Sequence, residues 1–73
     1  MEAKKYFEPG KDVYVIRLDR NENELYFITA KVVDVTYGDE TMYICRAYAD
    51  STLYNVSEKD VFATSQEAEE RCK

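Results

Sequence analysis

The sequence predicts a mainly β fold: an antiparallel barrel of five strands with a short C-terminal α-helix. Val, Ile, Thr, Tyr and Phe are concentrated in segment 25–49, which is typical of paired strands. Polar segments rich in Asp, Asn, Gly and Ser separate the apolar runs, as turns do. The apolar parity changes once within a long second strand, as expected where a strand bends to close a small barrel. We therefore expect the 73 residues, 1–73, to form a single small domain.

The first eleven residues end in a turn, because Pro9 presets φ and Gly10 tolerates a positive φ. The following run predicts a first strand at about 12–18. Its apolar residues occupy both parities, so we expect both of its faces to be covered. The polar segment 19–24 predicts a loop.

A long hairpin comes next, with strands at about 24–37 and 41–49 and a turn around Gly38-Asp39. A bulge or sharp bend is predicted inside the first of these strands, because its apolar residues change face midway. One face carries Tyr26, Ile28, Ala30 and Val32, and the other carries Val33, Val35 and Tyr37. In the next strand both parities are apolar, with Met42, Ile44 and Tyr48 against Tyr43, Cys45, Ala47 and Ala49.

The last third of the chain predicts short elements. A turn at Asp50-Ser51 leads to a strand at about 52–56, a 3₁₀ turn over 57–60 and a strand at about 61–63. Thr64 with Glu67 fits a capping box, which predicts a helix over about 65–72. Ala68 and Cys72, four residues apart, form the apolar stripe that would dock this helix.

Composition argues against several classes of function. Ten basic against fifteen acidic residues leave a net charge of −5, and no run of Lys or Arg offsets it, so direct nucleic-acid binding is not favoured. There is no His, and the two Cys lack CxxC spacing, so we expect no metal site. The chain has only two Gly and no Gly-rich phosphate loop, and neither cysteine has an activating neighbourhood, so we expect no cofactor and no enzyme. The absence of a signal-like or membrane-length apolar run predicts a cytoplasmic protein with reduced thiols and no membrane partner.

Three segments carry a resemblance that covers nearly the whole chain: Phe7-x-Pro9-Gly10-x-x-Val13-Tyr14-Val15-Ile16, then Lys31-Val32-Val33-Asp34-Val35, then Asp60-Val61-Phe62-Ala63-Thr64-x-x-Glu67-Ala68. In these turns and apolar positions, and in the order of its elements, the chain resembles small bacterial and phage SH3-like proteins of the KOW or Tudor type, which are mostly uncharacterised. The resemblance implies an SH3-like barrel and transfers no activity. The chain departs from this family in charge: KOW-type barrels that bind nucleic acid tend to be basic, whereas this chain is acidic.

Two sets of residues are candidates for contacting a partner. The first comes from six tyrosines in or at the ends of the expected strands, Tyr48 and five others, which are more aromatic side chains than so thin a core can hold. The five taken as contact residues are Tyr14, Tyr26, Tyr37, Tyr43 and Tyr54. The second is a group of carboxylates in the two expected loops: Asp19, Glu22, Glu24, Asp39 and Glu40. For a single tyrosine, packing in the core or its rim is the alternative, and for the carboxylates a solvated surface.

These residues leave three interpretations of function. The leading one is a non-catalytic SH3-like module that binds a protein through exposed tyrosines and acidic loops. The second is an inhibitor encoded by a phage or mobile element, of the anti-restriction or anti-CRISPR type, whose carboxylates mimic phosphates and block a basic, nucleic-acid-handling enzyme. The third is a single-strand nucleic-acid binder that stacks bases on tyrosine. An exposed edge strand would also allow a homodimer.

Overall fold

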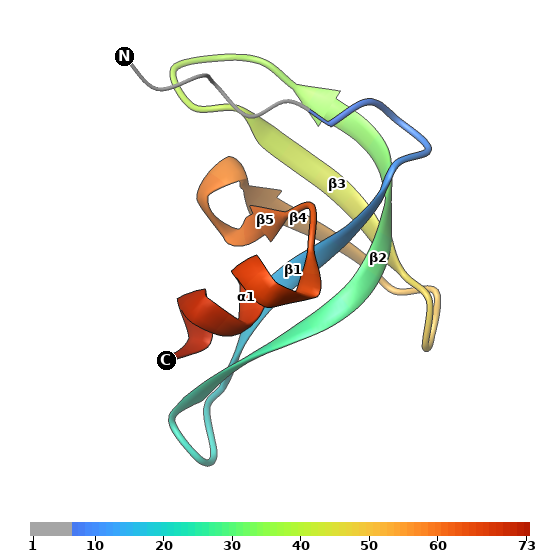
Figure 1. Cartoon of the computed structure of the whole chain (residues 1–73). Coiled ribbons are helices and arrows are strands. Elements are labelled where there is room, and N and C mark those ends of the chain that lie inside the picture. The colour runs from blue at the N-terminus through green and yellow to red at the C-terminus, as the bar shows by residue number, and fades with distance from the viewer. Residues whose placement is uncertain (1–6) are drawn as a thin grey trace.

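The computed structural model describes residues 7–73, which form one sheet and one α-helix (Figure 1). The elements in chain order are β1 (Asp12–Asp19), β2 (Glu24–Thr36), β3 (Met42–Ala47), β4 (Leu53–Ser57), the 3₁₀ helix η1 (Glu58–Asp60), β5 (Val61–Phe62) and α1 (Ser65–Cys72). Every predicted element is present, and most boundaries agree to within a residue.

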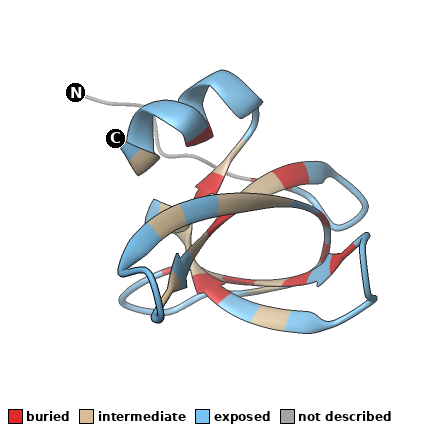
Figure 2. Cartoon of the chain, turned by 90° about the horizontal axis from the view of Figure 1, so that it is seen from below, coloured by how far each residue is buried: buried red, intermediate tan, exposed pale blue. Residues whose placement is uncertain are grey.

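The five strands form a single sheet in the order β4-β3-β2-β1-β5, and every neighbouring pair is antiparallel. The sheet is strongly curled, so that its inner face surrounds the core (Figure 2). Its two outermost strands, β4 and β5, are not paired with each other in the strand order. The mainly β, five-stranded antiparallel prediction is therefore confirmed, whereas the closed barrel stays a prediction.

The bulge predicted from the parity change lies in β2. Val32 pairs with Cys45, but the next pair joins Asp34 to Ile44, so Val33 is the extra residue. Val33 points outward and is 42 % exposed, whereas Val35 packs against the core cluster. One inserted residue thus returns the apolar side chains of β2 to the inner face after the bend.

The core lies on the concave inner face of the sheet. It is built mainly from small or β-branched side chains around one large aromatic residue, Tyr43, which is fully buried. The ring of Phe7, from the segment before β1, packs edge-on against Tyr43 at 5.6 Å between ring centroids. The cluster consists of Phe7, Val13, Val15, Ala30, Val32, Tyr43, Cys45, Val56 and Val61.

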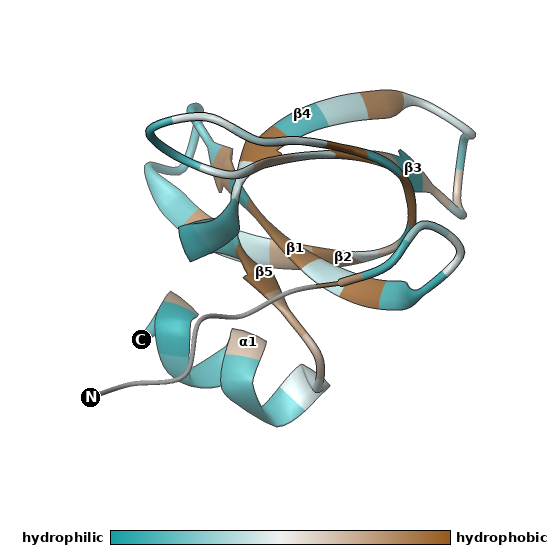
Figure 3. Cartoon of the chain, turned by 90° about the horizontal axis from the view of Figure 1, so that it is seen from above, coloured by the Kyte–Doolittle hydropathy of each residue, from teal (hydrophilic) through white to brown (hydrophobic). Residues whose placement is uncertain are grey.

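Helix α1 packs on the convex side of the sheet against β1, β2 and β5. Ala68 is fully buried and Cys72 is half-buried, as the predicted apolar stripe requires, and the rest of the helix is hydrophilic (Figure 3). Ile16 is buried outside the main cluster, on the parity of β1 opposite to Val15. Both faces of β1 are therefore covered as far as Ile16, whereas Leu18 on the same outer row is 49 % exposed.

The predicted caps and turns are confirmed in detail. The Thr64 hydroxyl accepts a hydrogen bond from the Glu67 amide at 3.2 Å and donates to the Glu67 carboxylate at 3.1 Å. Gly10 has a φ of 97°, and its amide donates to the Val32 carbonyl at 2.7 Å, which ties the turn before β1 to the bend of β2. Only a residue that tolerates positive φ suits this position without strain.

The predicted third strand extends two residues too far at its C-terminal end. It ends at Ala47, and residues 48–50 form a turn in which Tyr48 and Ala49 no longer pair as strand residues. The Asp50 carboxylate accepts a hydrogen bond from the Thr52 amide at 3.0 Å, and Ser51 adopts a positive φ of 60°. This side-chain-stabilised turn competes with the ladder, and the apolar pattern at 48–49 did not reveal it.

Candidate functional site

The structure divides the predicted contact residues between the two ends of β2. One acidic group, Asp19, Glu22 and Glu24, lies in and beside the β1–β2 loop. The other, Asp39 and Glu40, lies in the β2–β3 turn. The loop and the turn are at opposite ends of the same strand, so the fold does not bring these two groups together (Figure 1).

Tyr43 requires a correction, because it was predicted to contact a partner and is fully buried. Its hydroxyl accepts a hydrogen bond from the Phe7 amide at 3.1 Å, so even its polar atom is used inside the molecule. In this fold its side chain is not available to a partner. The reason is the row it belongs to: Tyr43, Cys45 and Ala47 form the inner row of β3, and Met42 and Ile44 the outer one.

Two of the predicted tyrosines, Tyr26 and Tyr54, lie beside Arg17 at the β1–β2 end of the inner face. Arg17 and Tyr26 are directly paired across β1 and β2, so their side chains leave the same face of the sheet. The Arg17 guanidinium carbon lies 4.2 Å from the centroid of the Tyr54 ring, which is a cation–π contact. Tyr54 is half-buried against the core, whereas Tyr26 is 45 % exposed. We call Arg17, Tyr26 and Tyr54 the open-end cluster.

The acidic β1–β2 loop adjoins this cluster. Asp19 pairs with Glu24 two positions beyond the Arg17–Tyr26 pair. The Asp19 carboxylate accepts hydrogen bonds from the amides of Asn21 at 3.0 Å and Glu22 at 3.3 Å, which shapes the loop from within. Glu22 and Glu24 are exposed. The β1–β2 end therefore combines an accessible aromatic ring with exposed carboxylates.

The β2–β3 end is different, because one of its carboxylates is already paired. Glu40 accepts a hydrogen bond from the Ser57 hydroxyl at 2.8 Å and lies 3.5 Å from the Lys59 ammonium. The Ser57 hydrogen bond, helped by Lys59, holds the pKa of Glu40 below its ordinary value. Tyr37 at this end is 65 % exposed. A partner would have to compete with Lys59 for Glu40.

Tyr14 and Tyr48 lie outside the inner face. Tyr14, a predicted contact residue, is half-buried and packs edge-on against Phe27 at 5.8 Å between ring centroids. Tyr48, which was not among the predicted contact residues, is 54 % exposed and donates a hydrogen bond to the Asp12 carboxylate. This hydrogen bond raises the pKa of the Tyr48 hydroxyl. Tyr48 thus ties the β3–β4 turn to the start of β1.

The two cysteines differ in how deeply they are buried. Cys45 is fully buried in the core, and burial raises the pKa of its thiol to about 11, which disfavours the thiolate that a nucleophile or ligand needs. Cys72 is half-buried near the end of α1. Within residues 7–73 no three His, Cys, Asp or Glu side chains lie together as metal ligands would. None of the helices in the same residues has the length and apolarity to cross a membrane.

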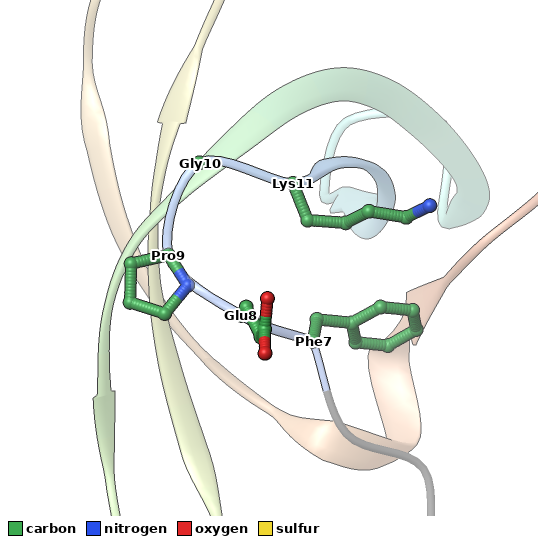
Figure 4. A pocket seen from close by; sticks show the side chains of 5 residues that line it. All are labelled: Phe7, Glu8, Pro9, Gly10 and Lys11. Carbon is green, nitrogen blue, oxygen red and sulfur yellow. The ribbon is translucent and has the colours of Figure 1, made fainter.

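A cavity of about 550 Å³ is lined by five consecutive residues, Phe7 to Lys11 (Figure 4). The side chains of Phe7 and Lys11 extend to the same side of this segment, and Pro9 lies at its bend (Figure 4). The segment continues directly into residues 1–6, which the structure does not describe. The cavity therefore carries no functional argument.

A second pocket, of about 260 Å³, was not predicted from the sequence and lies between β1, the β1–β2 loop, the start of β2, η1 and α1. It holds three of the chain's arginines and one aspartate, and its lining is Ile16, Arg17, Leu18, Arg20, Leu25, Asp60 and Arg71. These residues are spread from position 16 to position 71, and only the docking of α1 on the sheet joins them. No local sequence pattern signals such a site.

Comparisons with protein-family models, with curated proteins and with solved structures found no match to this chain.

Proposed function

We propose that the chain is a non-catalytic, SH3-like protein-interaction module whose contact surface is the open-end cluster together with the acidic β1–β2 loop. The observation that carries the proposal is the position of Tyr26. Its ring is 45 % exposed, and it is paired with Arg17, whose guanidinium is fixed over Tyr54. A partly exposed tyrosine on a rigid strand is a typical interface anchor, because it offers a large contact area at a low cost in conformational entropy.

The strand arrangement supports the SH3-like part of the proposal. The order β4-β3-β2-β1-β5 places β1 between a long bent partner and a very short last strand, which follows a 3₁₀ turn. The bulge at Val33 supplies the bend that a small barrel needs. In this proposal the side chains of the inner face, rather than hydrogen bonds between β4 and β5, complete the barrel.

The charge of the contact surface indicates the chemistry of the partner. Glu22 and Glu24 are exposed beside Tyr26, and the chain as a whole carries a net charge of −5. A complementary partner presents an apolar or aromatic side chain to Tyr26 and Lys or Arg to the loop. Opposite charges at the rim mainly raise the rate of association and contribute less to the final affinity.

The test compares two exposed tyrosines at opposite ends of β2. Wild type, Tyr26→Ala and the control Tyr37→Ala are immobilised and exposed to an extract of the source cells, and the retained proteins are quantified by mass spectrometry. We expect at least one protein that wild type and Tyr37→Ala retain equally and Tyr26→Ala loses. The retained protein is then purified and must bind wild type directly. Equal retention by all three, or loss only with Tyr37→Ala, would contradict the proposal.

The salt dependence of the purified interaction separates this proposal from the inhibitor that mimics phosphates. An aromatic anchor with a few rim charges predicts a modest loss of affinity between low and physiological ionic strength, whereas a surface of phosphate-like carboxylates predicts a steep one. The separation of the two acidic groups and the pairing of Glu40 with Lys59 favour the first outcome. A steep loss would favour the inhibitor instead.

A further inference from the structure

The pocket between β1 and α1 has a charge opposite to that of the molecule. Its lining contains three arginines and a single aspartate, an excess of two positive charges, in a chain whose net charge is −5. Acidic residues outnumber basic ones in the chain, yet three of its arginines are gathered in this one concave site. The lining of the pocket is therefore basic, and it adjoins a loop in which Glu22 and Glu24 are exposed.

The geometry of the fold explains why the arginines meet here. Strand β5 pairs with β1 only at Tyr14 and Val15. Beyond Val15, β5 no longer covers this edge of β1, and other elements can approach it. Residues 16–18 of β1, Asp60 of η1 and Arg71 of α1 line this stretch. Arg20 reaches it from the start of the β1–β2 loop. Strand β1, the β1–β2 loop, η1 and α1 thus bring charged side chains to one stretch of the β1 edge.

The two arginines available to a ligand are Arg20 and Arg71. The guanidinium of Arg17 is occupied by the Tyr54 ring at 4.2 Å, so Arg17 contributes charge more than hydrogen bonds. One terminal nitrogen of Arg71 lies 3.5 Å from the Asp60 carboxylate, and this side chain is 46 % exposed. A guanidinium has five N–H donors, so a pair through one nitrogen leaves most of them for an anion.

We propose that this pocket binds the phosphate group of a small phosphomonoester, with Arg20 and Arg71 as its ligands. A phosphomonoester carries a charge of about −1.5 to −2 near neutral pH, which matches the excess positive charge of the lining. Guanidinium forks bind tetrahedral phosphate oxygens in pairs, and two forks from different elements contact different oxygens. The pocket volume of about 260 Å³ suits a small ligand, and Ile16, Leu18 and Leu25 offer an apolar wall for its organic part.

Asp60 has a definite role in this proposal. Its carboxylate oxygen lies 3.5 Å from a terminal nitrogen of Arg71, so it already takes one place at which a bound anion would contact that guanidinium. A phosphate entering the pocket competes with this carboxylate, so Asp60 weakens binding in the wild type. Arg71 lies outside the proposed protein-contact surface, whereas Arg20 stands in the β1–β2 loop that forms part of it. Phosphate titration of the chain without a protein partner therefore tests this site separately from the protein-interaction function.

The experiment is a titration of the full chain, followed by NMR of the backbone amides and arginine side chains, at constant ionic strength. The probes are inorganic phosphate, phenyl phosphate and acetate. We expect saturable shifts confined to residues 16–20, 25, 60 and 71, with phenyl phosphate tighter than inorganic phosphate because of the apolar wall. Tighter inorganic phosphate would identify a free-anion site and overturn the monoester assignment. Acetate binding as tight as phosphate would overturn it too.

Three variants test the assigned roles. Arg20→Ala should weaken phenyl phosphate binding by about tenfold or more, as expected for lost charge-assisted hydrogen bonds. Arg46→Ala is the control, because it removes the same charge from the exposed outer face of β3, outside the pocket lining. Asp60→Asn should tighten binding several-fold. Equal weakening by Arg20→Ala and Arg46→Ala, no tightening by Asp60→Asn, or no saturable shifts in wild type would each overturn the proposal.

Discussion

The two ends of the inner face are closed in different ways. At the end near the β2–β3 turn, Phe7 covers Tyr43 and both rings are buried. The Tyr43 hydroxyl there accepts a hydrogen bond from the Phe7 amide. At the other end Arg17 covers Tyr54 by a cation–π contact, and Tyr26 is left 45 % exposed. A ring buried with its polar atoms satisfied contributes to stability, whereas a ring left half in water is available for binding. We infer that the first end holds the fold together and the second contacts a partner.

The largest effect is expected from Phe7→Ala, at the closed end. Removing a buried aromatic side chain costs about 3–5 kcal/mol, because transfer energy is lost and a cavity is left above Tyr43. A chain of this length has a total stability of about 4–11 kcal/mol, so much of it would be lost. Urea unfolding followed by far-UV circular dichroism measures the change. A cost below about 1 kcal/mol would show that Phe7 does not close this end.

Alkaline pH tests how well the same core excludes water. Burial raises the pKa of the Cys45 thiol from 9.0 to about 11, so the folded state keeps its proton where the unfolded state loses it. The free energy of unfolding is therefore expected to fall by about 2–3 kcal/mol as the pH rises from 9 to 11.

Cys45→Ala supplies the control for this measurement, because it removes the thiol and leaves the tyrosines and lysines that also titrate there. The difference between the pH profiles of wild type and Cys45→Ala isolates the thiol. Parallel profiles between pH 9 and 11 would mean that water reaches Cys45 in the folded chain.

Tyr43→Phe sharpens the comparison by removing only a hydroxyl. The Phe7 amide then has no acceptor in a buried position, and a buried unpaired donor costs about 1–2 kcal/mol. The matched change at the open end is Tyr54→Phe, where the ring keeps its place under Arg17. Urea unfolding should show a loss for Tyr43→Phe and almost none for Tyr54→Phe. Equal losses would remove the distinction between the two ends.

Much of the fold follows from local patterns in the sequence. The parity change at Val33 predicted the bulge, Thr64 and Glu67 predicted the start of α1, and Pro9-Gly10 predicted a turn, because each of these features depends on residues close in the chain. The orientation of β3 did not follow, because Tyr43 and Ile44 stand on opposite faces and both rows are apolar. Only the partners supplied by Phe7 and Val13, which are distant in sequence, select the row of Tyr43 as the inner one.

The contact surfaces were less predictable for the same physical reason. The exposed carboxylates of the β1–β2 loop could be placed in a loop from the sequence, but their nearness to Tyr26 depends on strand pairing. The arginine pocket depends on the docking of a helix that begins more than forty residues after β1 ends. Composition pointed away from it, because a net charge of −5 conceals a local cluster of positive charge.

Tyr26→Ala tests the central claim most directly, when its stability and its partner binding are measured on the same preparation. We predict a free energy of unfolding within about 0.5–1 kcal/mol of wild type, as for a surface substitution, together with loss of the protein retained by wild type and by Tyr37→Ala. Unfolding that is as strongly affected as in Phe7→Ala, or partner binding that is unchanged, would contradict the division of the molecule into a structural end and a binding end.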